Sequence, residues 1–296
     1  MTPAPDRRPG GVDLIGVPYH LGRRGVGMGE GPRAILAGDD ALRRLEAAGP
    51  GGRVAWIDDQ LEADHEIGRT FELNRAVARR VGQARAAGAL PIVCSGNCNS
   101  AIGVIAGISV PRLAVVWLDA HPDFETPETT TSGFFDGMGL AIVTGACWHE
   151  MRHSVPGFGE VSEDDVLLVG VRDMAEPEAR RLEASSVAVV PPARIRGEGA
   201  DAALAPALDR LAGADGAYLH VDLDVLDPSE GRANAYAVAG GLTREELLAA
   251  VAATCERLDV LGAAVTAYDP SCDPAGDVRG VALDVLAAVA ASRGAA

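Results

Sequence analysis

The amino-acid sequence predicts an α/β fold, a three-layer α/β/α sandwich around a mostly parallel sheet. Apolar runs of strand length alternate along the chain with segments rich in Ala, Leu and Arg at helical spacing, an order typical of βαβ units. Most of these runs are continuously apolar, as in strands that are buried on both faces. No repeat and no long linker divides the chain, so we expect one domain over residues 1–296 with loose ends at about 1–10 and 292–296.

Short runs rich in Val, Leu, Ile and Ala are the predicted strands. In chain order they are Val12–Val17, Val54–Ile57, Leu90–Cys94, Leu113–Leu118, Val166–Val171, Val187–Val190, Ala217–Val221 and Gly262–Ala267. The segments with helical spacing are the predicted helices, at Pro32–Ala48, Ile67–Ala87, Ser100–Ala106, Glu176–Ala184, Asp201–Leu211, Thr243–Leu258 and Val281–Ser292. Sheets of this kind bind ligands at the carboxyl ends of their strands, where we expect the chemistry.

The charge balance restricts the partners of the protein. The net charge is −16, and the chain has 26 Arg and no Lys. Nucleic-acid binding is not expected, because it requires a basic face that neutralises phosphates. The lack of Lys also excludes Schiff-base chemistry and a P-loop lysine.

The cysteines and the N-terminus indicate the compartment. The chain has 5 Cys, an odd number, and no CxxC pair, so a reducing cytoplasm fits better than a disulfide framework. The start MTPAPDRRPGG is polar and rich in Pro, unlike a signal peptide or a membrane anchor. No window approaches about 18 uninterrupted apolar residues, so no membrane-spanning segment is expected.

Acidic residues gather where two predicted strands end. Asp119, His121 and Asp123 follow one strand at i, i+2, i+4, which on an extended chain points all three to one side; Asp222 and Asp224 follow another strand in the same way. Such crowded carboxylates need a cationic partner, either a divalent metal or Arg. Carboxylates with one imidazole suit Mn²⁺, Fe²⁺ or Zn²⁺. The alternative is that these Asp residues cap helices or close turns, although capping does not require this clustering.

These motifs resemble the arginase/agmatinase (ureohydrolase) family. Asp119–Asp123 resembles its DAHxD motif and continues into a TPETTTSG segment at 126–133; VDLDVLDP at 221–228, followed by GGLT at 240–243, resembles a second family segment. The Gly-rich loop at 25–32 and the GVRD strand end at 170–173 agree as well. The resemblance implies an arginase-like fold and a homotrimer or homohexamer.

The resemblance also implies a binuclear Mn²⁺ site and a hydrolytic function. Asp119, His121, Asp123, Asp222 and Asp224 match family ligands, with Asp119 and Asp222 as the bridging pair. Metal-bound hydroxide would attack the central carbon of a linear amidine or guanidino compound and break a C–N bond. Asp224 would orient that hydroxide.

The sixth ligand position departs from the family pattern. The family carries a His there, in GGDHS, whereas this chain has Cys98 in the segment SGNCN. A thiolate suits Zn²⁺ or Fe²⁺ better than Mn²⁺. The site could therefore hold one ion or two, and the metal could be Mn²⁺, Zn²⁺ or Fe²⁺. The alternative is a small buried thiol. One branch of the family, acting on hydroxylated arginine, carries a Cys here too.

Several substrate-contacting positions also differ. Asp136 takes the place of a proton-moving His, so that it would act as the acid only if its surroundings raise its pKa. Glu125 replaces an Asn that binds a carboxylate, and Ala175 replaces the acidic residue that holds an amino group. These changes argue against plain arginine and favour a cationic amidine or guanidine. The predicted substrate-binding set is Glu125, Ser132, Asp173, Tyr236 and Asp269, the last standing in for a guanidinium-facing Glu that aligns with Ala267.

Two other functions compete with the hydrolase. The altered ligand and substrate positions also fit a non-catalytic or regulatory homologue with a degenerate metal site. The related fold of the deacetylases raises amide deacetylation as a third hypothesis. The TPETTTSG and GGLT segments favour the ureohydrolase.

Overall fold

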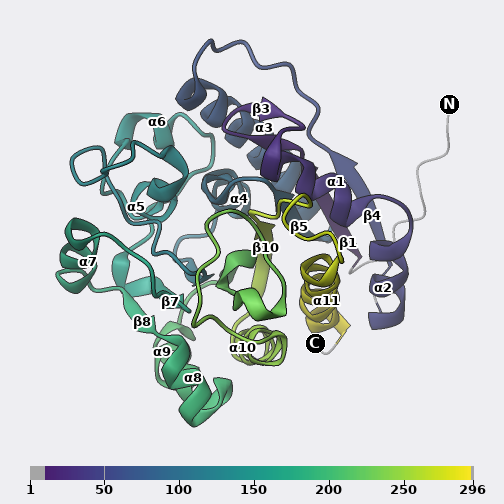
Figure 1. The fold of residues 1–296 in the computed structure, drawn as a ribbon. Coiled ribbons are helices and arrows are strands. Elements are labelled where there is room, and N and C mark those ends of the chain that lie inside the picture. The colour runs from purple at the N-terminus through teal and green to yellow at the C-terminus, as the bar shows by residue number, and fades with distance from the viewer. Residues whose placement is uncertain (1–10, 50, 295–296) are drawn as a thin grey trace, which may run out of the picture.

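A computed structural model describes residues 11–49 and 51–294 (Figure 1). Its centre is an eight-stranded sheet in the order β4-β1-β5-β10-β9-β6-β7-β8, in which every neighbouring pair is parallel. The strands are β1 (Val12–Val17), β4 (Gly52–Trp56), β5 (Leu90–Ser95), β6 (Ala114–Leu118), β7 (Val166–Val169), β8 (Ala188–Val190), β9 (Ala217–Asp222) and β10 (Val260–Thr266). The predicted α/β class is confirmed. The ends of each predicted strand agree with the observed ends to within two residues.

Helices cover both faces of the sheet (Figure 1). One apolar layer joins the sheet to α1 (Gly31–Leu36), α2 (Asp40–Ala48), α8 (Pro192–Glu198), α9 (Ala200–Leu211), α10 (Arg244–Arg257) and α11 (Asp277–Ala291). The other joins it to α3 (Glu66–Ala86), α4 (Ala101–Ile108), α5 (Gly139–Val143), α6 (His149–His153) and α7 (Glu176–Glu183). Successive residues of a strand belong to opposite layers, as Leu14 and Ile15 do, because side chains alternate across a strand. This explains the continuously apolar runs.

The structure corrects the prediction of one helix over Pro32–Ala48. Two helices, α1 and α2, lie there, and Gly38 between them has a φ of +70°, a left-handed conformation that ends a helix. The short helices α5, α6 and α8 and the two-residue strands β2 (Tyr19–His20) and β3 (Arg23–Arg24) were not predicted. Of the predicted loose ends, residues 1–10 and 295–296 lie outside the described residues, and Ser292–Gly294 forms a short 3₁₀ helix.

Strand order brings distant segments together. β10 and β9 lie between β5 and β6, although they come last in the chain. Thr266 of β10 pairs with Ser95 of β5 on one side and with Asp222 of β9 on the other. The segments that follow β5, β6, β9 and β10 therefore meet at one edge of the sheet. No helix in the described parts of the chain is long and apolar enough to cross a bilayer.

Candidate metal and substrate site

A cavity of about 210 Å³ opens at the carboxyl ends of the central strands. Its walls come from segments that follow strands β5, β6, β7, β9 and β10, which is the location that the fold predicts for a ligand. The residues lining it are Met28, Cys98, His121, Asp123, Glu125, Ser132, Phe134, Asp136, Gly137, Asp173, Met174, Ala175, Glu178, Asp222, Asp224, Asn234, Tyr236 and Ala267. Of the twelve predicted site residues, only Asp119 and Asp269 do not line it.

Asp119 lies just below the cavity at the end of β6. It is 1% exposed, and its Oδ2 accepts a hydrogen bond from Trp117 Nε1 at 3.0 Å while its Oδ1 accepts one from the His121 backbone at 2.8 Å. Burial, followed by the charge of Asp224, raises the pKa of Asp119 to about 6. A bound cation would offset this crowding of negative charge.

The end of β9 supplies two more buried carboxylates. Asp222 Oδ1 accepts a hydrogen bond from the Asp224 backbone at 2.8 Å, and Asp224 Oδ1 accepts one from the Ala120 backbone at 3.3 Å. The second bond ties the end of β9 to the segment that follows β6. Burial, followed by the charges of Asp224 and Asp119, raises the pKa of Asp222 well above its usual value.

His121 connects the two strand ends. Its Nδ1 lies 3.4 Å from Asp119 Oδ1 and 3.5 Å from Asp224 Oδ2. Burial alone would lower the pKa of His121, but the hydrogen bond to Asp119 and the surrounding carboxylates raise it to about 9. A metal ion would replace the proton in this position, because an imidazole must be neutral to bind metal.

Asp123 reaches the cavity by a different route from the predicted one. Strand β6 ends at Leu118, and Asp123 has a φ of +49°, so the segment 119–123 is not extended as the i, i+2, i+4 argument assumed. His121 and Asp123 nevertheless both line the cavity. The Asp123 Oδ2 atom is buried without a hydrogen-bond partner among the described residues, and burial with the neighbouring Asp119 raises the pKa of Asp123 strongly.

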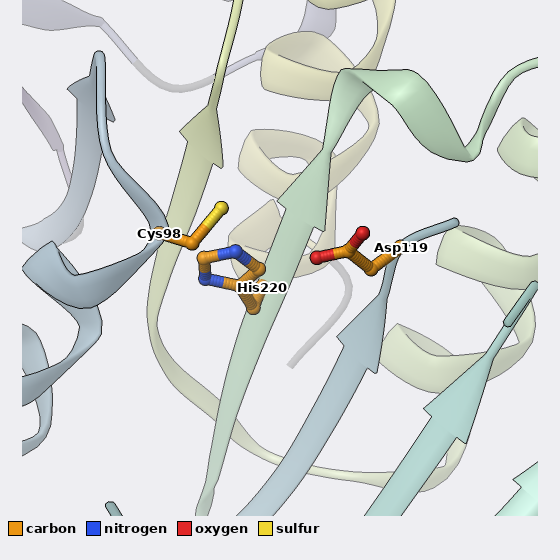
Figure 2. Close-up of side chains that lie close together, drawn as sticks. All are labelled: Cys98, Asp119 and His220. Carbon is orange, nitrogen blue, oxygen red and sulfur yellow. The ribbon is translucent and has the colours of Figure 1, made fainter. Parts of the chain in front are cut away.

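Cys98 completes the cluster from the loop after β5. Its Sγ lies 2.8 Å from Asp222 Oδ2, to which the thiol donates, and 3.3 Å from Thr266 Oγ1. Figure 2 shows the side chains of Cys98, Asp119 and His220 close together, and their donor atoms lie within 4.8 Å of one another. Burial, followed by the charge of Asp222, raises the pKa of the Cys98 thiol well above its usual value. Cys98 therefore has the position of a ligand, but only a cation would keep it deprotonated.

The donor set fits a divalent metal. Four carboxylates, one imidazole and one thiol converge in a buried region, and a second group of donor atoms within 4.8 Å consists of Asp119, His121 and Asp224. The unpartnered Oδ2 of Asp123 is the observation that ordinary hydrogen bonding does not explain. A buried carboxylate oxygen without a donor is costly unless a cation binds it.

Asp136 lies beside the loop that carries Cys98. Its Oδ2 accepts hydrogen bonds from Asn97 Nδ2 at 2.7 Å and from the Cys98 backbone at 3.1 Å, and its Oδ1 accepts one from the Asn99 backbone at 2.9 Å. Burial raises the pKa of Asp136 to about 6 even though these donors lower it. The carboxylate thus has two features, a raised pKa and a structural role in positioning the loop.

The cavity mouth carries the remaining substrate candidates. Ser132 and Asp173 are exposed, Glu125 is half-buried, and Tyr236 is 46% exposed with its ring 5.3 Å from that of Phe134. Asp173 Oδ2 lies 3.7 Å from His121 Nε2. Asp269 lies outside this set, since its Oδ1 accepts hydrogen bonds from Ser271 and it does not line the cavity. The wall at this position is Ala267, which has no polar side chain.

Two polar residues of the cavity were not predicted from the sequence. Asn234 donates to Asp224 Oδ2 at 3.2 Å and to the Ala267 carbonyl at 2.8 Å. Glu178 on α7 is 5% exposed and accepts a hydrogen bond from the Phe124 backbone at 2.8 Å; burial raises its pKa to about 7. Glu178 follows Asp173 by five residues, and a search for acidic residues on the first turn of the next helix would have found it.

Comparison with known proteins decides the family. The model of the Arginase family matches residues 11–291. The chain belongs to the arginase family. The arginase of Bacillus caldovelox is 30% identical over 288 residues, which cover 93% of this chain and 96% of the relative. The arginase of Brevibacillus brevis is 32% identical over 250 residues, 79% of this chain and 82% of the relative. The crystal structure of the arginase from Bacillus cereus has a TM-score of 0.85 and 26% identity, over 94% of this chain and 97% of that one.

Arginase-family membership confirms the resemblance on which the site was predicted. It implies a binuclear metal site, and the group Asp119, His121 and Asp224 supplies candidate ligands. The positions at which the sequence was expected to depart from the family pattern, Cys98, Glu125, Asp136 and Ala267, all line the cavity.

Proposed function

We propose that this protein is a metal-dependent hydrolase that breaks a C–N bond in a cationic amidine or guanidino compound without a free amino-acid head group. Its membership of the arginase family supports the general activity, hydrolysis of a C–N bond. The observation that carries the substrate class is the charge of the cavity. Seven of its lining residues are acidic and none is Arg.

Charge favours a cation and disfavours a carboxylate. The acidic lining residues are Asp123, Glu125, Asp136, Asp173, Glu178, Asp222 and Asp224. Four of them, Glu125, Asp136, Asp173 and Glu178, lie outside the proposed ligand set and line the rest of the cavity. A substrate carboxylate would meet these side chains without an Arg to pair with, whereas an amidinium or guanidinium would be attracted.

The residues that would hold the metal are Cys98, Asp119, His121, Asp123, Asp222 and Asp224. A divalent ion held by these residues would supply an activated water at neutral pH. A set of carboxylates with one imidazole suits Mn²⁺, while the thiol shifts the preference toward Zn²⁺ or Fe²⁺.

Residues of this chain would orient the reactants and move protons. Asp224 is held by Asn234 and the Ala120 backbone, so its carboxylate has a defined orientation toward the cavity. Asp136, with its pKa raised to about 6 by burial, would hold the proton that the leaving amine receives. Glu125, Asp173 and Glu178 would bind the cationic end of the substrate, with Tyr236 and Ser132 at the mouth.

Metal content and product release test this function together. Elemental analysis of the purified protein should find close to two divalent ions per chain. A content of one ion per chain would indicate a rebuilt mononuclear site. Cys98→Ala should lose metal, whereas Cys94→Ala, a matched control that is also buried but does not line the cavity, should keep it. Restoring the family histidine with Cys98→His should also retain metal.

Assays of urea and ammonia release then define the substrate. A decarboxylated guanidino compound should be hydrolysed with a kcat/KM at least about tenfold above that of arginine, a difference of about 1.4 kcal/mol. Activity with arginine equal to that of a true arginase would contradict the proposed substrate class. A protein free of metal after reconstitution with Mn²⁺, Zn²⁺ and Fe²⁺ would instead support the non-catalytic homologue.

Two further proposals concern the molecule outside the site. Family resemblance supports a homotrimer or homohexamer, which sedimentation velocity would distinguish from a monomer. The odd number of Cys and the lack of a CxxC pair support a cytoplasmic location, which cell fractionation would test.

A further inference from the structure

A chain of buried hydrogen bonds leads from the interior of the sheet to Cys98. Tyr218 Oη lies 2.7 Å from His220 Nδ1, His220 Nε2 lies 3.2 Å from Thr266 Oγ1, and Thr266 Oγ1 lies 3.3 Å from Cys98 Sγ. None of the four side chains is more than 4% exposed. They come from β9, β10 and the loop after β5, and β10 lies between β5 and β9 in the sheet.

The direction of these bonds follows from the tyrosine. Among the described residues, the Tyr218 hydroxyl has no hydrogen-bond partner except His220 Nδ1. A fully buried hydroxyl must donate its proton, so Tyr218 donates and Nδ1 accepts. The His220 proton then lies on Nε2, from which it is donated to Thr266 Oγ1. The Thr266 hydroxyl is thereby left to donate onward.

Thr266 has two acceptors for its proton. Cys98 Sγ lies at 3.3 Å and the Val221 carbonyl at 3.4 Å. When the sulfur is an anion, it is the stronger acceptor, because a hydrogen bond to a charged partner is roughly twice as strong as a neutral one. A donor is needed there, since Cys98 lies 2.8 Å from the Asp222 carboxylate, which would repel a thiolate.

The imidazole is held in this orientation by packing. The Trp117 ring stacks on His220 with centroids 3.6 Å apart and an angle of 12° between the planes, and its Nε1 donates to Asp119 Oδ2. Figure 2 shows the His220 ring between Cys98 and Asp119. Both ring nitrogens are already used, so His220 could bind a metal only by giving up one of its two hydrogen bonds.

We infer that Tyr218, His220 and Thr266 are positioning residues that hold Cys98 as a metal-bound thiolate, with Thr266 donating to the sulfur and His220 not itself a ligand. This inference rests on the proposed function, in which Cys98 binds metal. It explains how a sulfur ligand is accommodated beside Asp222. Partners of this kind typically change metal affinity about 10- to 100-fold when they are removed.

Titration of the metal-free protein with Co²⁺ tests the inference, because a Co²⁺–thiolate bond gives a near-ultraviolet charge-transfer band. Thr266→Val should weaken Co²⁺ binding roughly 10-fold or more and move the band to lower energy, since the sulfur loses its hydrogen-bond donor. Thr266→Ser should have the Co²⁺ affinity and the band energy of the wild-type protein, because it keeps the hydroxyl. Tyr218→Phe should change the Co²⁺ affinity and the band energy in the same direction as Thr266→Val, but by a smaller amount. Thr254→Val should change neither, because Thr254 is a fully buried residue of α10 whose hydroxyl bonds only to the Ala250 carbonyl in the described structure.

Different failures have different meanings. A band in the wild-type protein that Thr266→Val leaves unchanged in energy and affinity would overturn the positioning chain and leave the proposed function intact. Absence of the band in the wild-type protein would show that Cys98 is not a ligand and would overturn both. Detection of a second coordinated imidazole by pulsed electron paramagnetic resonance of the Mn²⁺-loaded protein, lost in His220→Gln, would make His220 a ligand and also overturn the inference.

Discussion

Asn234 shows how one side chain supports the reactive carboxylate. Its Nδ2 donates to Asp224 Oδ2 and to the Ala267 carbonyl, and its Oδ1 accepts a hydrogen bond from the Tyr236 backbone at 2.8 Å. One amide therefore connects the ends of β9 and β10 with a residue at the cavity mouth. A buried network in which every partner is satisfied orients a site more strongly than its separate bonds would.

We predict that Asn234→Leu lowers kcat at least about tenfold, because Asp224 loses a donor that fixes its orientation. The free energy of unfolding should also fall by about 1–3 kcal/mol, since buried acceptors lose their partner. Steady-state kinetics and chemical denaturation measure the two effects. Asn74→Leu is a suitable control, because Asn74 is equally buried and bonds to Thr70 and Gly103 away from the cavity. It should lose stability only, and an equal loss of kcat in both variants would contradict the prediction.

The sequence indicated the clustered carboxylates of the site better than the polar side chains that stand alone. Asp119 and Asp222 stand in recognisable clusters at strand ends, and such clusters are rare without a ligand. Asn234 lies in a loop with no such pattern, and only the fold brings it to Asp224. Asp269 was expected in the site because it follows Ala267 closely, but its carboxylate bonds to Ser271 in a turn of its own.

Arg172 joins three loops at the element scale. Its guanidinium donates to the carbonyls of Gly170, Asp224, Val225, Leu226, Val238 and Ala239, at distances of 2.8–3.3 Å. These carbonyls belong to the end of β7, the segment after β9 and the loop before α10. The planar guanidinium with its five donors makes this possible, and an ammonium could satisfy only part of the set.

Arg172→Lys should therefore lower the free energy of unfolding by roughly 2–4 kcal/mol, because several buried carbonyls lose their donor. It should also increase KM, since Asp224 and Asp173 depend on the loops that Arg172 joins. Chemical denaturation and kinetics test this. Arg180→Lys on the exposed face of α7, where Arg180 pairs only with Glu176 in the described structure, should change stability by less than about 0.5 kcal/mol. If both substitutions cost the same, Arg172 does not have this role.

Asp227 fastens the turn after β9 to the loop before α10. Its carboxylate accepts hydrogen bonds from Ser229 and from the backbones of Gly240 and Gly241. The Ser229 bonds, followed by those from Gly240 and Gly241, lower the pKa of Asp227 to about 2. Because the folded-state pKa lies below the unfolded value of about 3.9, the stabilisation is complete above about pH 4 and disappears as the pH falls toward 2.

We therefore predict that Asp227→Asn lowers Tm at pH 6 and that its Tm difference from the wild-type protein narrows between about pH 4 and pH 2. Ser229→Ala should give a smaller loss with the same pH window, because it removes one of the donors. Calorimetry of the metal-free proteins at several pH values measures the differences. A difference that stays constant down to pH 2 would show that ionised Asp227 does not stabilise the turn.

The strands of the main sheet were predictable from their apolar runs, whereas the short helices α5, α6 and α8 were not. The runs that became β5, β6 and β9 are completely buried, so their composition carries a strong signal. α5 has five residues, all buried, and its apolar sequence GLAIV has no helical period of its own. Its conformation depends on packing against the rest of the molecule, which a local pattern does not contain.

Strand order is a property of the whole molecule that alternation of strands and helices leaves open. The insertion of β10 and β9 between β5 and β6 brings Cys98 within 2.8 Å of Asp222, although 124 residues separate them. Alternation predicts a parallel sheet with ligands at its carboxyl edge, but several strand orders satisfy it equally. The family resemblance, not the local pattern, indicated which strand ends would meet.

The charge of the whole molecule also acts on the cavity. A net charge of −16 produces a negative potential around the protein, and the acidic cavity adds to it for an approaching cation. For a cationic guanidino substrate, kcat/KM should fall at least about threefold when NaCl is raised from about 0.02 M to 0.5 M, because the Debye length shortens from roughly 20 Å to about 4 Å. Asp173→Asn should show a shallower dependence, since Asp173 is an exposed carboxylate at the mouth. The inhibition constant of an uncharged urea analogue should be nearly independent of salt, and an equally steep dependence for both compounds would show that the acidic field does not attract the substrate.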